Sequence, residues 1–309
     1  MPKALLVLQK NDHSLGYYAP ESGAPLGRVA LDPYPHEFAV SGDGGRAYCC
    51  HFGVALAEDE GPGGDTVSVV DVAAKERIGT LDCGAFRRPH GIALDGQGQL
   101  FVLSEGASRL LVAPDPDAGA FVQDQPTGGH GSHWVTVTAD GSLAFVSNMA
   151  SNSLTVVFPQ DPARPPVSIP MGHRPEGSVL DATEERLYLV NRESAEISVI
   201  DAIALKALEP IKTPPGPVRI CWDDRGRLLV PLYHDRSLAI VDPARPEPQS
   251  IIELPDKPVA ISYDSDLNWA FVSTLGDKVW VVDVATERRL HAIETAAGPD
   301  PSTTVMLDS

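Results

Sequence analysis

Short apolar runs alternate with polar turns along the whole chain, and residues 132–157 show the pattern most clearly. Residues 134–138 are mainly aromatic or β-branched, which favours a pleated strand over a helix. Asp140-Gly141 follows, a dipeptide typical of a tight hairpin because glycine adopts positive φ at no steric cost. Two further apolar runs, residues 143–147 and 153–158, flank a second polar turn. The stretch therefore predicts a three-stranded antiparallel meander.

This pattern returns at a nearly constant spacing. One residue can be aligned before each expected innermost strand: Pro35, Pro89, Ser132, Pro175, Pro217, Pro258 and Pro301. The spacings between them are 54, 43, 43, 42, 41 and 43 residues. A period near 43 residues with about four short strands is typical of a propeller blade. No long segment shows helical periodicity, so the sequence predicts an all-β, seven-bladed β-propeller.

The two ends of the chain are expected to share one blade. The chain begins on a second strand at Ala4 and ends on a first strand, residues 302–307. Pairing the two would close the ring and remove an open sheet edge. We therefore expect a single domain over residues 1–309. The expected blades are residues 1–32 with 299–309, then 33–86, 87–129, 130–172, 173–214, 215–255 and 256–298.

One repeat carries an insertion. Residues 54–65 add three glycines and the acidic run Glu58, Asp59 and Glu60 on the side where the innermost strands begin. The segment is either a surface loop that tolerates insertion or an acidic lid over a pocket. The sequence leaves both interpretations open.

Charge and cysteine content narrow the class of protein. The 42 acidic residues outweigh 24 basic ones, giving a net charge of −18. Without clustered lysine and arginine, binding to nucleic acid or to anionic membranes is not expected. The four cysteines fit neither a disulfide framework nor a zinc finger. The N-terminal apolar run is too short for a signal peptide, so we expect a reduced, cytoplasmic protein.

The strongest chemical signal is a register of histidines. The position after each aligned residue faces the mouth of the propeller channel, and four successive blades place His36, His90, His133 and Glu176 there. The other three blades supply Val218, Val259 and Ser302. Three imidazoles and a carboxylate would suit a divalent ion such as Mn, Fe or Zn. Alternatively, Glu176 is a general base and one imidazole a general acid, or the ring merely holds ordered water.

Other polar residues surround this register. The ends of the second strands form a second ring that includes His51, Glu105 and Arg192, and Arg174 precedes the aligned Pro175. Arg174 and Arg88 could bind a carboxylate or phosphate in bidentate fashion, or they could be solvated loop residues. The catalytic candidates are therefore Glu176, His133, His51 and Arg174, and the metal candidates are His36, His90, His133 and Glu176. No glycine motif for a nucleotide cofactor is present.

The repeat resembles a known family. The segments TADGSLAFVSNMASNSLTVV (138–157), ERLYLVNRESAEISVID (185–201) and NWAFVSTLGDKVWVVDVAT (268–286) are similar to the YVTN-repeat seven-bladed propellers. More loosely, the chain resembles the 6-phosphogluconolactonase-like propellers, in which Pro-His recurs at the start of an inner strand, as at Pro35-His36 and Pro89-His90. That resemblance implies lactonase-like chemistry.

Three functions remain after the sequence alone. The first is an enzyme that acts on a small polar metabolite at the channel mouth by hydrolysis, isomerisation or elimination. The second is a non-catalytic propeller that binds ligands or proteins, although its aromatic content of 6% is low for such a surface. The third is a metal-binding protein without turnover. The sequence leaves the oligomeric state open.

Overall fold

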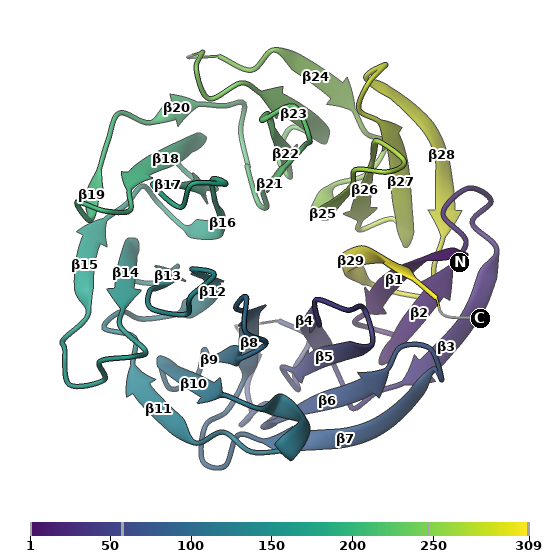
Figure 1. Ribbon diagram of the computed structural model, residues 1–309. Helices are drawn as coiled ribbons and strands as arrows, with labels where there is room; N and C mark the ends of the chain where they lie inside the picture. The colour runs from purple at the N-terminus through teal and green to yellow at the C-terminus, as the bar shows by residue number, and fades with distance from the viewer. Residues whose placement is uncertain (1, 57–58, 246, 308–309) are drawn as a thin grey trace.

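The computed structural model describes residues 2–56, 59–245 and 247–307. Seven antiparallel sheets stand in a ring around one axis, with their innermost strands facing that axis (Figure 1). We number the blades along the chain from the N-terminus. The predicted all-β, seven-bladed propeller is confirmed.

In blades 1 to 4, four strands succeed one another from the axis outward. Blade 1 contains β29 (Pro299–Met306), β1 (Lys3–Gln9), β2 (Ser14–Tyr18) and β3 (Pro25–Ala30). Blade 2 contains β4 (Pro35–Val40), β5 (Arg46–His51), β6 (Thr66–Asp71) and β7 (Glu76–Asp82). Blade 3 contains β8 (Pro89–Leu94), β9 (Leu100–Ser104), β10 (Arg109–Ala113) and β11 (Gln123–Pro126). Blade 4 contains β12 (Ser132–Val137), β13 (Ala144–Asn148), β14 (Ser153–Val157) and β15 (Val167–Pro170).

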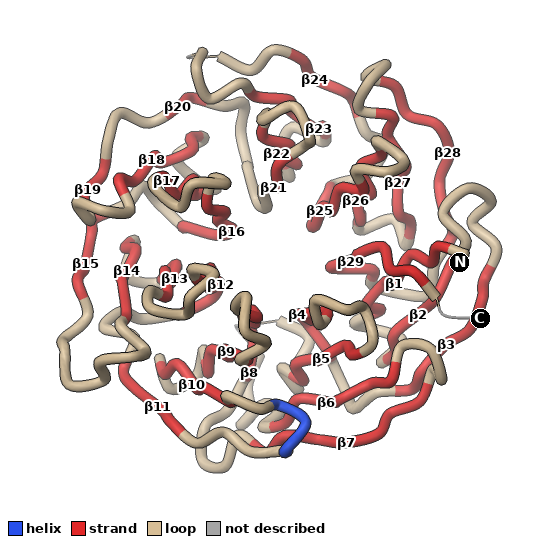
Figure 2. Tube along the Cα trace, viewed as in Figure 1, coloured by secondary structure: helices blue, strands red, loops and turns tan. Residues whose placement is uncertain are grey.

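Blades 5 to 7 follow the same order. Blade 5 contains β16 (Pro175–Leu180), β17 (Arg186–Asn191) and β18 (Glu196–Asp201), with β19 (Lys206–Ala207) and β20 (Ile211–Lys212) both paired to β18. Blade 6 contains β21 (Cys221–Trp222), β22 (Leu228–Leu232), β23 (Ser237–Val241) and β24 (Ser250–Glu253). Blade 7 contains β25 (Pro258–Asp264), β26 (Trp269–Thr274), β27 (Lys278–Asp283) and β28 (Arg288–Glu294). In the described residues the single helical element is the 3-10 helix η1 (Pro116–Ala118), between β10 and β11 (Figure 2).

The core lies between neighbouring blades, and β9 shows why the middle strands are mostly apolar. All five of its residues are buried. Leu100 and Val102 pack in the cluster shared with blade 2, whereas Phe101 and Leu103 pack in the cluster shared with blade 4. Because successive side chains of a strand point to opposite faces, both faces of each blade become buried. The ring is therefore rigid around its axis.

The C-terminal strand closes the ring as predicted. Strand β29 pairs with β1 in antiparallel register from Lys3 opposite Met306 to Gln9 opposite Pro299. The two ends of the chain consequently lie beside one another in blade 1 (Figure 1). An ion pair of 2.7 Å between Lys3 Nζ and Asp264 Oδ2 joins this blade to blade 7.

The register of this last strand differs from the sequence-based prediction. Pro299 pairs with Gln9, just as Pro35 pairs with His51 in blade 2. The residue equivalent to Pro35 is therefore Pro299 rather than Pro301, and the channel-mouth residue of blade 1 is Asp300 rather than Ser302. Two prolines, Pro299 and Pro301, stand close together here, so spacing alone placed the strand two residues too late.

All four cysteines, Cys49, Cys50, Cys83 and Cys221, are unpaired. Burial raises the pKa of the Cys49, Cys83 and Cys221 thiols to about 12, so these thiols stay protonated at neutral pH. In the described part of the chain, no helix has the length and apolar character needed to cross a bilayer.

Candidate active site at the channel mouth

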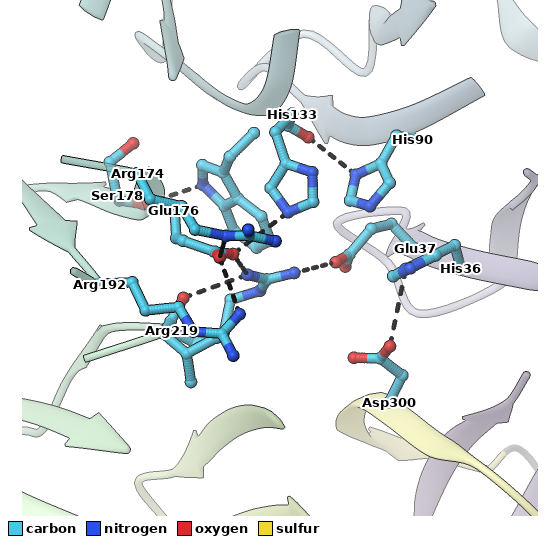
Figure 3. Close-up of polar contacts among 12 residues, drawn as sticks. His36, Glu37, His90, His133, Arg174, Glu176, Ser178, Arg192, Arg219 and Asp300 are labelled. Atoms are coloured by element: carbon cyan, nitrogen blue, oxygen red, sulfur yellow. Dashed lines mark hydrogen bonds and ion pairs between the residues drawn. The ribbon is translucent and has the colours of Figure 1, made fainter. Parts of the chain in front are cut away.

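A cavity of about 150 Å³ lies where the innermost strands begin. The four residues of the predicted register, His36, His90, His133 and Glu176, all line it. They project from β4, β8, β12 and β16, which are successive innermost strands and so hold the side chains on a rigid frame (Figure 3). The structure therefore brings these four predicted residues together.

The three imidazoles form a stack. The ring centroids of His36 and His90 are 4.2 Å apart, and those of His90 and His133 are 3.9 Å apart. The ring of Phe52 meets both His36 and His90 edge-on, each at 5.5 Å. Such close packing prevents all three rings from carrying a positive charge at once.

His90 is a neutral member of the stack, and one of its ring nitrogens has a free lone pair. Its Nδ1 lies 2.8 Å from the backbone carbonyl oxygen of His133 and must donate to it, which leaves Nε2 unprotonated. Nε2 is buried and has no hydrogen-bond partner among the described residues. Burial, together with the positive charge of His133, holds the pKa of His90 well below its ordinary value. At neutral pH, Nε2 can therefore accept a proton or bind a metal ion.

His133 is the charged member. Its Nδ1 is 3.1 Å from Glu105 Oε2, and its Nε2 is 3.3 Å from Glu176 Oε2. Burial alone would lower the pKa of His133, but the hydrogen bonds to these two carboxylates raise it to about 9. The ring is therefore an imidazolium at neutral pH, beside a neutral His90.

Glu176 is a carboxylate that accepts hydrogen bonds from three arginines. Its Oε1 accepts from Arg174 Nε at 3.2 Å and from Arg192 Nη1 at 3.3 Å, and its Oε2 accepts from Arg219 Nη1 at 3.1 Å (Figure 3). Burial opposes the charge of this carboxylate, but the hydrogen bond from His133 and the positive arginines hold its pKa well below the ordinary value. Glu176 is thus an anion at neutral pH, and both of its oxygens are occupied by the three arginines and His133. Its predicted role as a general base stays a prediction.

Arg219 spans the channel and was not predicted from the sequence. Its Nη2 donates to Glu37 Oε1 at 2.7 Å while Nη1 binds Glu176, and its guanidinium lies 4.7 Å from the centre of the Trp134 ring. The guanidinium and both carboxylates are buried. Burial raises the pKa of Glu37 to about 6, against the opposing charge of Arg219. At the predicted channel-mouth position, blades 6 and 7 supply only Val218 and Val259. Arg219, the residue after Val218, fills that part of the ring.

Asp300 completes the ring from blade 1. Its Oδ2 lies 3.6 Å from His36 Nδ1 and 3.8 Å from Lys10 Nζ. Burial raises the pKa of this carboxyl, partly offset by the positive charge of Lys10. Burial likewise keeps the pKa of His36 well below its ordinary value, so His36 is neutral like His90.

The residue directly before Pro35, and before the position equivalent to Pro35 in the other blades, adopts a left-handed backbone in six blades. In three blades it is a glycine, as this conformation favours, namely Gly131, Gly216 and Gly298 with φ of 64°, 86° and 72°. In the other three it is Tyr34, Arg88 or Arg174, with φ of 52°, 59° and 56°. A large side chain there costs about 1–2 kcal/mol of backbone energy. Backbone strain of this kind clusters at functional sites, and Arg174 combines it with a place at the cavity.

The remaining predicted residues lie in different places. His51 is buried inside blade 2, where Nε2 lies 2.7 Å from Ser68 Oγ and Nδ1 lies 3.1 Å from the carbonyl oxygen of Asp32. It does not line the cavity, and burial lowers its pKa to about 4. Arg174 does line the cavity, and 41% of its side chain is exposed. Glu105 and Arg192, from the expected second ring, also line it.

The insertion contributes to one wall. Ala55 and Leu56 line the cavity, and Arg88 Nη2 donates to the carbonyl oxygens of Asp59 and Gly61 at 2.7 and 2.9 Å. Glu58, part of the expected acidic run, lies outside the described residues. Arg88 therefore ties the insertion to the start of blade 3, and whether the segment moves as a lid stays a prediction.

Among the described residues, two groups of side chains could hold a metal ion. They are His36 with Glu37 and His90, and His90 with Glu105 and His133, and in each group the donor atoms lie within 4.8 Å of one another. Three of the four predicted ligands occur in these groups, and Glu176 occurs in neither. The second group would require His133 to lose its proton, whereas the first already contains two neutral imidazoles.

Comparison with known proteins establishes the fold alone. No family model matches the sequence, and no curated protein matches it, so the YVTN resemblance stays a prediction. The structure is similar to a periplasmic gluconolactonase, PpgL, from Pseudomonas aeruginosa, with a TM-score of 0.81, 18% identity and 99% of each chain covered. It is also similar to a candidate 6-phosphogluconolactonase from Bacteroides uniformis, with a TM-score of 0.78, 14% identity and coverage of 99% and 100%.

A third similar structure belongs to a protein whose name indicates a different chemistry. Hydrazine synthase from Kuenenia stuttgartiensis matches with a TM-score of 0.70, 16% identity and coverage of 94% of this chain and 91% of that one. One fold thus carries several chemistries, and function has to be argued from the site. What the comparisons establish is that this chain is a propeller whose structural neighbours include lactonases.

Proposed function

We propose that this protein is a propeller enzyme that hydrolyses the lactone ring of a small polar metabolite at the channel mouth. The proposal is carried by one observation: a neutral His90 with an unpartnered Nε2 is stacked on a charged His133 at the edge of a cavity. A base and an acid of separate protonation state are what acid–base hydrolysis needs. The same pair suits isomerisation or elimination, but the likeness to a gluconolactonase structure favours hydrolysis.

The first half of the reaction uses His90. Its Nε2 removes a proton from water while the water oxygen forms a bond to the lactone carbonyl carbon. The negative charge that develops on the carbonyl oxygen is stabilised by the imidazolium of His133 and by Arg174 on the cavity wall. Glu176 and Glu105 position His133 and keep it protonated.

The second half uses His133. As the ring C–O bond breaks, the departing oxygen takes a proton from the imidazolium of His133 and becomes a hydroxyl group. The proton held by His90 then restores His133, and the new carboxylic acid releases its own proton to solvent. Each turnover therefore consumes one water molecule and releases one proton.

The charge of the cavity suits an anionic product or substrate. Lys10, Arg174, Arg192 and Arg219 line it, although the whole chain has a net charge of −18. Arg174 is the most accessible of these cations that pair with Glu176. We infer that Arg174 binds a carboxylate or phosphate oxygen of the ligand, as a guanidinium does well.

Metal-assisted hydrolysis is the second candidate, and one observation favours it. His36 Nδ1 and His90 Nε2 are both buried and have no hydrogen-bond partner among the described residues, and Glu37 completes the group. These residues fit a divalent ion such as Mn, Fe or Zn. Such an ion would polarise a carbonyl oxygen or lower the pKa of bound water. Elemental analysis of the purified protein tests this: a stoichiometric metal that His36→Ala removes supports it, and its absence refutes it.

A pH-stat assay tests the lactonase proposal. Proton release from sugar lactones is followed with wild-type protein and corrected for spontaneous hydrolysis. His90→Asn retains a group that can bind the His133 carbonyl but lacks Nε2, so kcat should fall by about 100-fold or more. The matched control is His291→Asn in β28, whose ring contacts the Pro20 carbonyl oxygen far from the cavity. Full activity in His90→Asn would exclude His90 as the base, and the absence of turnover on any lactone would favour the non-catalytic binding alternative.

A further inference from the structure

A second hollow adjoins the candidate active site. It has a volume of about 530 Å³, more than three times that of the cavity, and it shares Glu105, Met149 and Arg174 with it. Its other walls come from the loops at the same end of blades 4 and 5. Because the two hollows share three lining residues, a ligand in the cavity can extend into this groove without leaving the protein surface.

The walls of the groove are preformed. In blade 4, the amides of Met149 and Ala150 donate to the carbonyl oxygens of Gly131 and His130 at 2.9 and 3.1 Å. Between the blades, the Arg174 amide donates to Asn152 Oδ1 at 2.9 Å. A groove held by main-chain hydrogen bonds is ready to bind without rearrangement.

The lining of the groove matches a polyhydroxylated ring. His173, Asn152 and the two glutamates Glu105 and Glu193 offer hydrogen-bond donors and acceptors, while Met149 and Ala150 offer apolar surface. The ring nitrogens of His173 make no hydrogen bond or ion pair with the part of the chain that the structure describes. A sugar ring likewise has polar edges and apolar faces, so it matches this lining.

Arg174 stands where the two hollows meet. Its backbone keeps a φ of 56°, a conformation for which three other blades use glycine at the equivalent position. Its side chain contacts Glu176 in the cavity and also lines the groove. A ligand that spans both hollows would therefore pass this guanidinium.

We propose that the substrate is two units long, with the lactone unit in the cavity and a second polyhydroxylated unit, such as a glycosyl group, in the groove. The proposal rests on the proposed lactonase function. The groove then selects the substrate, while the His90 and His133 pair acts on its reactive end.

The test compares one-unit and two-unit ligands. The kcat/KM of wild-type protein is measured by pH-stat for D-glucono-1,5-lactone and for its 4-O-glucosyl and 6-O-glucosyl derivatives. At least one two-unit lactone should be preferred by tenfold or more. Ala150→Trp, which fills the groove from an exposed position, should reduce that preference at least tenfold, and His173→Ala should reduce it in part. The matched control is Ala204→Trp, an exposed alanine in the turn after β18, at the opposite end of blade 5.

Two kinetic outcomes overturn the proposal, and both differ from failure of the lactonase function. Equal kcat/KM for one-unit and two-unit lactones in wild type shows that the groove takes no part. If Ala150→Trp and Ala204→Trp change the preference for two-unit lactones equally, the groove again takes no part. If no lactone is hydrolysed, the proposed reaction fails, and binding of gluconate and its 4-O- and 6-O-glucosyl derivatives is measured by saturation-transfer NMR. A glucosyl gluconate that then binds no better than gluconate overturns the groove as well.

Discussion

Replacing Arg219 by methionine should destabilise the protein more than any exposed ion-pair change. Arg219 is buried and joins Glu37 and Glu176 at 2.7 and 3.1 Å. Methionine keeps most of the side-chain volume but leaves two buried carboxylates without their shared cation. Glu176 keeps Arg174, Arg192 and His133, but Glu37 loses its cation. Breaking a buried pair by removing one partner costs about 3–5 kcal/mol, because the remaining charge is uncompensated. We expect a loss of unfolding free energy of that size at pH 8.

The unfolding free energy lost in Arg219→Met should be larger at high pH than at low pH. Burial raises the pKa of Glu37 from 4.5 to about 6, so the folded state binds this proton more tightly than the unfolded state. The resulting stabilisation is complete below pH 4.5 and is lost as the pH rises through 6, and at 1.36 kcal/mol per pKa unit it amounts to about 2 kcal/mol. Without Arg219 the pKa of Glu37 rises further. The variant should therefore come closer to wild type at pH 5 than at pH 8.

Urea unfolding followed by tryptophan fluorescence at pH 5 and pH 8 measures both effects. The matched control is Arg77→Met, which breaks an ion pair of 2.8 Å with Asp32 whose side chains are 30% and 42% exposed. Removing such an exposed pair costs at most about 1 kcal/mol. A loss in Arg219→Met as small as in the control, and equal at both pH values, would refute the argument that a buried charge bridge holds the channel mouth together.

Three further predictions test separate features. The pKa of His133, about 9 in the folded protein against 6.5 ordinarily, means that its stabilisation is complete below pH 6.5 and is lost as the pH rises through 9. Urea midpoints at pH 7 and pH 10 should show this fall in wild type but not in His133→Gln; an equal fall in both would contradict the assignment. Arg174→Gly relieves a left-handed backbone, so its unfolding free energy should stay within about 1 kcal/mol of wild type while kcat/KM falls by about 100-fold. A variant that keeps full kcat/KM would remove Arg174 from the site. Deleting residues 299–309 exposes the edge of β1, and the protein should lose solubility or melt at lower temperature. Melting like that of the intact chain, followed by circular dichroism, would speak against closure by β29.

The repeat in the sequence was enough to predict the fold and the three-histidine register. Each blade must bury both faces of its middle strands, so the apolar runs recur at a fixed period. His36, His90, His133 and Glu176 each follow the first residue of an innermost strand, a position that the turn before it marks. Because the strands are held by the ring, the shared register placed these four side chains at one cavity.

Only the tertiary structure placed the other charged residues. A β-bulge at the start of the innermost strands, seen between Pro35 and Phe38, breaks the simple alternation of side chains. Glu37 and His36 are neighbours in sequence, and strict alternation would send them to opposite faces, yet both belong to one group of side chains that could hold a metal ion at the channel mouth. Arg219, at the position equivalent to Glu37, reaches across the channel in the same way. Asp300 was missed because the strand begins two residues earlier than the spacing indicated.

The protonation states depended on the assembled ring. Nothing in the sequence distinguishes His90 from His133, which occupy the same position of neighbouring blades. In the folded protein, His133 lies between two carboxylates and is charged, while His90 donates to a carbonyl oxygen and is neutral. Electrostatic interactions between groups far apart in the chain decide a pKa, and they exist only once the blades have closed around the axis.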